Sequence, residues 1–208
     1  MSLPKEIQQL LENSYGALLS FHFSSGGCIN SGGVARFKRE TIFVKWNSIE
    51  KYPGMFKAEA KGLDLLRQAD LKVPEVYFID NTTSLSFLVL EYIGSEARGS
   101  AYWQELGHGL AQLHKIHNDS YGLDHDNYMG SLKQYNEPSF HWLDFFIRYR
   151  IDPQVKLASE NGYISTSELR RIHSFKKNIA NILTEEKPSL VHGDLWSGNI
   201  MIDSNKSL

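Results

Sequence analysis

Hydrophobic and polar residues alternate through much of the first half of the chain, with the period of two that is typical of β-strands. The alternation runs through residues 18–46, where two glycine pairs interrupt it, and it predicts a twisted antiparallel meander. Two further strands are predicted at VYFID (76–80) and SLSFLVLEYI (84–93). This half of the chain is therefore expected to be mainly β-sheet.

Two helices accompany these strands in the predicted pattern. A short amphipathic helix at the N-terminus has an apolar face of Ile7, Leu10 and Leu11. A longer helix, MFKAEAKGLDLLRQA (55–69), has four apolar residues on one face: Phe56, Ala60, Leu63 and Leu66.

The period changes to that of α-helices after Gly94. Helices are predicted at 102–117, 140–158 and 166–186, and the first of them has an apolar stripe of Trp103, Leu106, Leu110 and Leu113. The change of pattern predicts an α+β, two-lobed protein. Its expected lobes are an N-terminal sheet lobe with one long helix (1–92) and a mainly helical C-terminal lobe (93–208).

Composition excludes several classes of protein. With 208 residues, 41% of them hydrophobic, the chain can bury a substantial core. The net charge is −2 and the 22 Lys and Arg residues are dispersed, which argues against a nucleic-acid partner and favours a small molecule. The charged start and the single cysteine predict a cytoplasmic protein without internal disulfides, and no run of residues is apolar enough for a membrane span.

The segment LVHGDLWSGNIMID (190–203) contains the strongest candidate chemistry. Two short apolar runs, Leu190-Val191 and 200–202, are expected to be strands that flank a polar loop. Asp194 and Asn199 have the D-x-x-x-x-N spacing of a kinase catalytic loop, in which the Asp accepts a hydroxyl proton and the Asn oxygen binds Mg²⁺. A plain β-turn explains the same residues about equally well when the segment is taken alone.

Three earlier features favour the kinase interpretation because they occur in the order that a kinase requires. The segment SSGGCINSGG lies between predicted strands, and its glycines would let backbone N–H groups approach phosphates, although it is not a G-x-G-x-x-G motif. Lys45 then interrupts an apolar strand, and Glu59 follows on the next helix, where it could pair with that lysine.

The sequence at this point resembles the fructosamine kinase (ketosamine kinase) family, which is related to the aminoglycoside phosphotransferases. The resemblance extends over about residues 15–203. It rests on HGDLWSGN together with GGCIN, FKAEAKGL, LVLEYI, ELGHGLAQLH, NYMGSLKQYN and W-x-x-F-F-x-x-R-x-R-I-x-P. It implies a protein-kinase-like fold and the transfer of the ATP γ-phosphoryl group to a sugar hydroxyl of a glycated amine, with Mg²⁺ as cofactor. The phosphorylated product would decompose and release the amine, which is a repair of glycation.

The resemblance also implies roles for individual residues. Asp194 would be the base and Asn199 a metal ligand, while Trp196, as a wall for the sugar or as packing under the loop, would join Asn127, Tyr128 and Gln134 at the substrate. The nucleotide would be bound by Gly26, Gly27, Cys28, Asn30, Lys45, Glu59, Glu91, Tyr92 and Ile93, the last three through main-chain groups that meet the adenine.

One departure from the family pattern is expected to affect activity. Kinases of this class have a second metal-binding Asp on the strand after the catalytic loop, but only Asp203 follows Asn199, and it lies in a predicted turn. The chain is therefore expected to be truncated and not fully active. Two alternatives stay open: an aminoglycoside or choline type of phosphotransferase, and an inactive nucleotide-binding module.

Other candidate sites receive simpler interpretations. His108, His114 and His117 lack acidic or cysteine partners nearby, so a metal site there is not expected. The loop 124–126 is expected to be solvated and near the substrate entrance, and Arg148 and Arg150 to face solvent or the space between lobes. Oxidation of Cys28 could link two copies of the chain, so the protein is expected to be a monomer or a Cys28-linked dimer.

Overall fold

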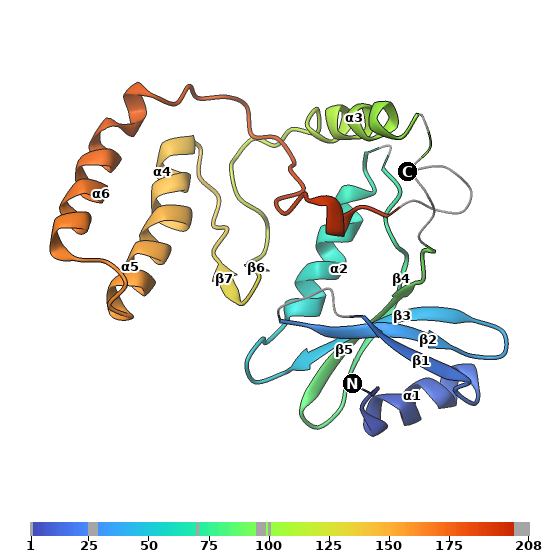
Figure 1. Cartoon of the computed structure of the whole chain (residues 1–208). Coiled ribbons are helices and arrows are strands. Elements are labelled where there is room, and N and C mark those ends of the chain that lie inside the picture. Colours follow the sequence, from blue (N-terminus) through green and yellow to red (C-terminus); the bar gives the residue numbers. More distant parts are fainter. Residues whose placement is uncertain (1, 25–28, 70, 95–98, 100, 202–208) are drawn as a thin grey trace. The chain divides into compact units, whose positions relative to one another are not determined.

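The computed structural model describes residues 2–24, 29–69, 71–94, 99 and 101–201 (Figure 1). The chain divides into two compact units, of which the first is Met1–Leu113 with His192–Leu208 and the second is His114–Val191. The lobe boundary inferred from the sequence, at residues 92 and 93, stays a prediction.

The first unit contains a five-stranded antiparallel sheet. Its strands have the spatial order β1-β2-β3-β5-β4, with the bounds β1 (Ser20–Ser24), β2 (Ser31–Arg36), β3 (Thr41–Ser48), β4 (Val76–Asn81) and β5 (Leu85–Glu91). Because β1, β2 and β3 are antiparallel neighbours in chain order, the predicted meander is confirmed.

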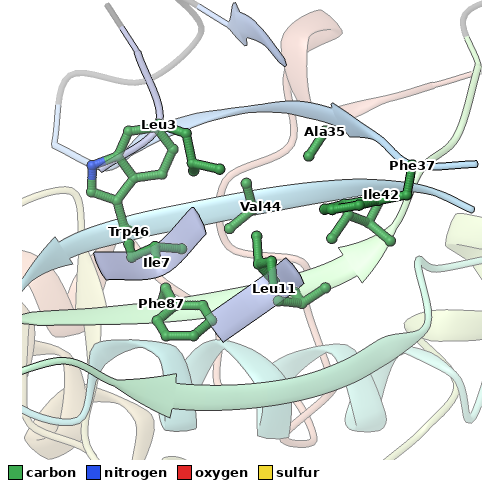
Figure 2. Close-up of a cluster of buried hydrophobic side chains, with 10 residues drawn as sticks. Leu3, Ile7, Leu11, Ala35, Phe37, Ile42, Val44, Trp46 and Phe87 are labelled. Carbon is green, nitrogen blue, oxygen red and sulfur yellow. The ribbon is translucent and has the colours of Figure 1, made fainter. Parts of the chain in front are cut away.

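Helix α1 (Lys5–Tyr15) packs on one face of this sheet. Ile7 and Leu11 are fully buried, and Figure 2 shows both side chains against Val44 and Phe87 of the central strands. The amphipathic face predicted from the sequence is therefore the face that forms this core. We expect Leu11→Ala to lower the free energy of unfolding by about 2–5 kcal/mol.

Helix α2 (Met55–Leu66) packs on the opposite face of the sheet (Figure 1). Its Phe56 is buried against Leu88 and Leu90 of β5. Successive side chains of a strand point to opposite faces, so the residues of β3 that alternate with the α1 core belong to the α2 side. Lys45 is one of these, and it lies opposite Leu88 in the register of β3 and β5.

Gly33, in the middle of β2, has no room for a side chain. A Cβ atom there would lie 2.5 Å from the carbonyl oxygen of His22 and 2.4 Å from Cζ of Phe21, both on the neighbouring strand β1. Because the backbone oxygen cannot turn away, we expect Gly33→Ala to lower the free energy of unfolding by about 1–3 kcal/mol in urea denaturation.

Gly62 provides a matched control for this change. It lies inside α2, and nothing lies within 4 Å of the position that an alanine methyl group would take, so Gly62→Ala should stabilise the helix by about 1 kcal/mol. Equal stabilities of the two variants would contradict the close approach of β1 and β2 at Gly33.

Helix α3 (Tyr102–Leu113) lies at the end of the first stretch of this unit, residues 1–113. One residue of its predicted apolar stripe is wrong. Leu106 and Leu113 are buried as expected, but Trp103 is 65% exposed and Tyr102 takes the buried position. Residue 102 lies four positions before Leu106, which places it on the same face of the helix, and its ring packs edge-on to the indole of Trp103.

The second unit is built around one long, interrupted helix. It consists of α4 (Trp142–Phe146), a π-helical turn (Ile147–Ile151) and α5 (Asp152–Glu160), and α6 (Thr166–Asn178) lies beside it (Figure 1). Rings of Tyr121, Trp142, Phe145 and Tyr149 pack together along it. A 3₁₀ turn (Ile179–Asn181) follows α6, whose N-terminus has a capping box of Ser165 and Glu168.

A small hairpin in the second unit is absent from the elements predicted from the sequence. Its strands β6 (Asn127–Met129) and β7 (Leu132–Gln134) have three residues each, which is too short to show an alternating pattern. Asn127 lies opposite Gln134 in this pair.

The two strands predicted around the catalytic-loop segment are not formed in the described residues. Leu190 and Val191 lie outside any strand, although the neighbouring Ser189 makes a single bridge to His117, and Ile200 and Met201 are also non-strand. Short apolar runs become strands only when another strand pairs with them, and periodicity alone does not supply that partner. The polar segment itself contains a 3₁₀ turn (Ser197–Asn199).

None of the helices among the described residues has the length and apolar character that a membrane crossing requires.

Candidate nucleotide and phosphoryl-transfer site

Lys45 and Glu59 form an ion pair between β3 and α2. The distance from Lys45 Nζ to Glu59 Oε1 is 2.6 Å, and the two side chains are 25% and 27% exposed. The strand register places Lys45 on the α2 side, and Glu59 lies one turn after the buried Phe56. The carboxylate therefore holds the ammonium group in a partly exposed position, where it can still reach an anion.

Asn30, a residue of the segment SSGGCINSGG, is hydrogen-bonded to β3, the strand that carries Lys45. Its Oδ1 accepts a hydrogen bond of 2.9 Å from Nδ2 of Asn47, a residue of β3 that is only 5% exposed. The same Nδ2 lies 3.1 Å from the sulfur of Met55, at the start of α2. The predicted phosphate-covering residues Gly26, Gly27 and Cys28 lie outside the described residues. The expected oxidation of Cys28 therefore stays a prediction.

The end of β5 carries the residues expected to meet the adenine. The Glu91 N–H donates to the carbonyl of Glu75 at 2.9 Å, and the Glu91 carboxylate accepts from the Glu75 N–H at 3.1 Å. Since the Glu91 N–H is engaged within the protein, Tyr92 and Ile93 are the better positions at which to test adenine recognition.

Asp194 and Asn199 are joined by two hydrogen bonds. The Nδ2 group of Asn199 donates to the carbonyl oxygen of Asp194 at 2.8 Å and to its carboxylate Oδ2 at 3.0 Å. Both acceptors lack hydrogens when the carboxylate is ionised, so the amide must turn its nitrogen towards Asp194. Oδ1 of Asn199 is thereby left as the outward atom, and it is the atom type that a Mg²⁺ ion binds.

The turn around Asp194 holds its main chain and leaves its side chain accessible. Gly193 has a φ of 82°, in the left-handed region that favours glycine, and the Asp194 N–H donates to Nδ1 of His192 at 3.3 Å. Asp194 itself is exposed. A carboxylate held in this way can accept a proton from a bound hydroxyl.

Trp196 folds back over its own loop. A Cβ atom at Gly198 would lie 2.4 Å from the indole ring, so any side chain at position 198 would displace the indole. The side chain is 55% exposed, so part of the indole surface is accessible to a ligand. The contact with Gly198 is also compatible with the alternative role of Trp196, which is packing against its own loop.

Several predicted site residues are brought together in pairs. Lys45 contacts Glu59, Asp194 contacts Asn199, and Asn127 pairs with Gln134 across the small hairpin. Among the residues that the structure describes, no hydrogen bond or ion pair links the first two pairs, and no three His, Cys, Asp or Glu side chains cluster together. A hard cation at the Asp194–Asn199 loop could take Asn199 Oδ1 as one protein ligand.

One polar residue of the second unit lies elsewhere than the sequence suggests. Arg150, expected to face solvent or the space between lobes, hydrogen-bonds inside the unit to Asn136, a residue only 2% exposed. Tyr128, a predicted substrate residue, lies in β6 next to Asn127.

The fold and the two pairs define an α+β protein of the kinase-like class. A strand lysine paired with a helix glutamate, followed by an Asp and an Asn in D-x-x-x-x-N spacing, is the arrangement of parts used in phosphoryl transfer. The chain belongs to the fructosamine kinase family, whose model matches residues 3–208. The resemblance inferred from the sequence motifs is confirmed.

Curated relatives agree with this assignment. The chain is 32% identical over 208 residues to a Vibrio vulnificus protein named as a ketoamine kinase, covering 98% of this chain and 70% of the relative. It is 36% identical over 190 residues to the chloroplastic protein-ribulosamine 3-kinase of Arabidopsis thaliana, covering 86% of this chain and 56% of the relative. The chain thus spans between 56% and 70% of the length of these relatives.

Solved structures extend the comparison to the fold. A Haemophilus somnus protein named as a fructosamine-3-kinase superposes with a TM-score of 0.80 at 32% identity, covering 96% of this chain and 68% of the other. The aminoglycoside phosphotransferase APH(4)-Ia, solved with AMP-PNP and hygromycin B, gives a TM-score of 0.66 at 14% identity, covering 97% and 68%. The second likeness shows a shared fold, and the predicted kinase-like architecture is confirmed.

Proposed function

We propose that the full-length protein uses ATP to phosphorylate a sugar hydroxyl of ketosamines, the products of amine glycation. The Asp194–Asn199 geometry carries this proposal, because it combines an accessible carboxylate with an outward amide oxygen in one short loop. Membership of the fructosamine kinase family supports the choice of substrate class.

In the proposed reaction, Asp194 accepts the proton of the attacking sugar hydroxyl. The hydroxyl oxygen forms a bond to the γ-phosphorus, the bond from that phosphorus to the β–γ bridging oxygen breaks, and ADP leaves. Lys45 contacts the phosphates of the nucleotide, and Glu59 keeps its ammonium group in place. Trp196 lines the sugar position with the exposed part of its indole.

The donor set of the loop fits a hard cation. Asn199 Oδ1 would hold Mg²⁺, which when bound neutralises negative charge on the phosphate oxygens. Hydrogen bonds to Asp194 fix this amide before any metal arrives, so the oxygen is already turned outward.

We further propose that the protein acts in the cytoplasm, although the Arabidopsis relative is named as chloroplastic. A monomer is the simplest state for a small-molecule kinase. The Cys28-linked dimer is tested by non-reducing electrophoresis with and without Cys28→Ala.

The test is a substrate comparison with the full-length protein. ADP release in the presence of Mg²⁺ is measured with fructosyl-lysine, ribulosyl-lysine, an aminoglycoside and choline as acceptors, and the product is examined by mass spectrometry for one added phosphoryl group. Turnover of either ketosamine that exceeds both other acceptors supports the proposal. Faster turnover of the aminoglycoside or choline would replace it, and ATP binding without any turnover would indicate an inactive module.

A further inference from the structure

The segments before and after the β6–β7 hairpin are tied together by a single buried residue, Asn136. The Asn136 N–H donates to the carboxylate of Asp126 at 3.1 Å, and its carbonyl accepts from the Leu123 N–H at 3.1 Å. The chain passes so close that a Cβ at Gly122 would lie 2.5 Å from the Asn136 carbonyl oxygen. Asn136 therefore fixes the position of the strand that carries Asn127.

Arg150 supplies the hydrogen bond that orients the Asn136 amide. Its Nη2 donates to Asn136 Oδ1 at 2.5 Å, and its Nη1 donates to the carbonyls of Tyr135 and Tyr149 at 2.8 and 3.0 Å. The guanidinium also lies over the ring of Phe145, 4.6 Å from the centroid. Burial lowers the pKa of Arg150 from its ordinary value, but a guanidinium stays protonated and can only donate.

The location of Arg150 in a π-helical turn follows from the sequence. Pro153 lies four residues after Tyr149 and has no N–H to donate to the Tyr149 carbonyl, and a proline ring in this position crowds that oxygen. The helix widens before the proline, and the carbonyl is satisfied by Arg150 instead. The motif R-x-R-I-x-P thus contains the reason for its own irregular turn.

These contacts determine which atom Asn127 turns outward. Since Arg150 can only donate, the Asn136 atom that it meets is the oxygen, and the Asn136 nitrogen faces the other way. That nitrogen donates to the His125 carbonyl at 3.1 Å, which agrees with the assignment, and to Asn127 at 2.9 Å. The Asn127 atom in this bond must then be its oxygen, so the Asn127 NH₂ group is the outward group.

The outward NH₂ of Asn127 stands beside a second carboxamide. Gln134 is its direct cross-strand neighbour, and directly opposite residues of an antiparallel pair project from the same face. Both residues are half-buried, and in the part of the chain that the structure describes the Asn127 NH₂ group has no hydrogen-bond acceptor. Two neighbouring carboxamides suit a ligand rich in hydroxyl groups, since each hydroxyl both donates and accepts.

We infer that Arg150 and Asn136 are positioning residues that set the polarity of Asn127, so that the hairpin offers an N–H donor to an oxygen atom of a hydroxyl-rich ligand. This inference rests on the proposed function for the identity of the ligand. The positioning itself depends only on the contacts within the second unit.

Asn127→Asp is the sharpest variant for testing this inference. The aspartate keeps an oxygen for the Asn136 NH₂ group, so the network is preserved, but its outward atom becomes a negatively charged acceptor. In the full-length protein we expect the KM for fructosyl-lysine to rise about 10-fold or more, the factor of one lost hydrogen bond, while the KM for ATP stays within about 2-fold of wild type.

Arg150→Met should raise the KM for fructosyl-lysine, because the amide of Asn136 is no longer held in one orientation. Arg150→Lys keeps a positively charged donor and should raise this KM less. Arg148→Met is the matched control, since Arg148 is an exposed arginine of the same turn and should leave both KM values unchanged. If Arg150→Met does not fold, as judged by its melting temperature, Asn127→Asp carries the kinetic test alone.

A second measurement is independent of turnover. In the wild type the Asn136 side-chain NH₂ should exchange its hydrogens slowly by NMR and that of Asn127 quickly, and Arg150→Met should abolish the protection of Asn136. Unchanged protection in Arg150→Met, or an unchanged KM for fructosyl-lysine in Asn127→Asp, would overturn the inference. A wild-type protein that phosphorylates no ketosamine would instead refute the proposed function, and the exchange measurement would still decide the positioning role.

Discussion

Asp194→Asn in the full-length protein should lower kcat by at least about 10²-fold, the lower end of the range for loss of a general base, while ATP affinity changes little. The amide keeps the size of the carboxylate and retains an oxygen for the Asn199 NH₂ group, so the two hydrogen bonds that shape the loop can persist. What the variant loses is the ability to take the hydroxyl proton. The effect is therefore expected in the chemical step.

The measurement is steady-state kinetics with fructosyl-lysine, combined with direct titration of ATP binding. Asp80→Asn is a suitable control, because Asp80 is an exposed carboxylate on β4 whose hydrogen bond is made to its own neighbour, Asn81. A parallel loss of ATP binding and rate in Asp194→Asn would show that the residue binds nucleotide and would remove it from the role of base.

The second large effect is expected for Lys45→Met, which should both raise the KM for ATP and lower kcat, each by about 10-fold or more. Hydrogen bonds to charged groups contribute about 1.5–3 kcal/mol, and the phosphates that lose this donor are charged in both the ground state and the transition state. Glu59→Gln keeps the side-chain length but weakens the restraint on Lys45, so it should produce a smaller effect of the same kind.

Stability measurements separate this role from a structural one. The pair is about one quarter exposed on each side, so solvent screens it, and its loss should change the free energy of unfolding by no more than about 1 kcal/mol. Lys57→Met, at an exposed lysine of the same helix, is the matched control. An unchanged KM for ATP in Lys45→Met would place Lys45 outside the nucleotide site.

The parts of the fold that follow from side-chain periodicity are predictable from the sequence. Alternation predicts the strands around Val44, and the spacing of Ile7 and Leu11 predicts the helix that covers them. The pairing of Lys45 with Glu59 is predictable for the same reason, because strand alternation and one helical turn bring both residues to one face of the sheet.

The parts that periodicity does not reveal depend on partners distant in the chain. The β6–β7 hairpin is too short to have a readable period, and its position depends on Asn136, in an irregular segment after β7, and on Arg150, in a π-helical turn. Leu190 and Val191 resemble a strand, but apolar character does not identify a pairing partner. Trp103 is large and apolar, which predicts a place in the core, whereas Tyr102 occupies that face.

The alternation along β3 also affects how reliably the chain folds with the correct strand register. Val44 belongs to the α1 core and Lys45, the next residue, to the face with Glu59. A slip of β3 by one position would exchange them, leaving an ammonium group in the apolar layer and a valine against the carboxylate. Burial of an unpaired charge is among the costliest errors a folding chain can make. Misaligned chains are thus energetically disfavoured, so Lys45, the proposed phosphate contact, also helps to enforce the register of β3.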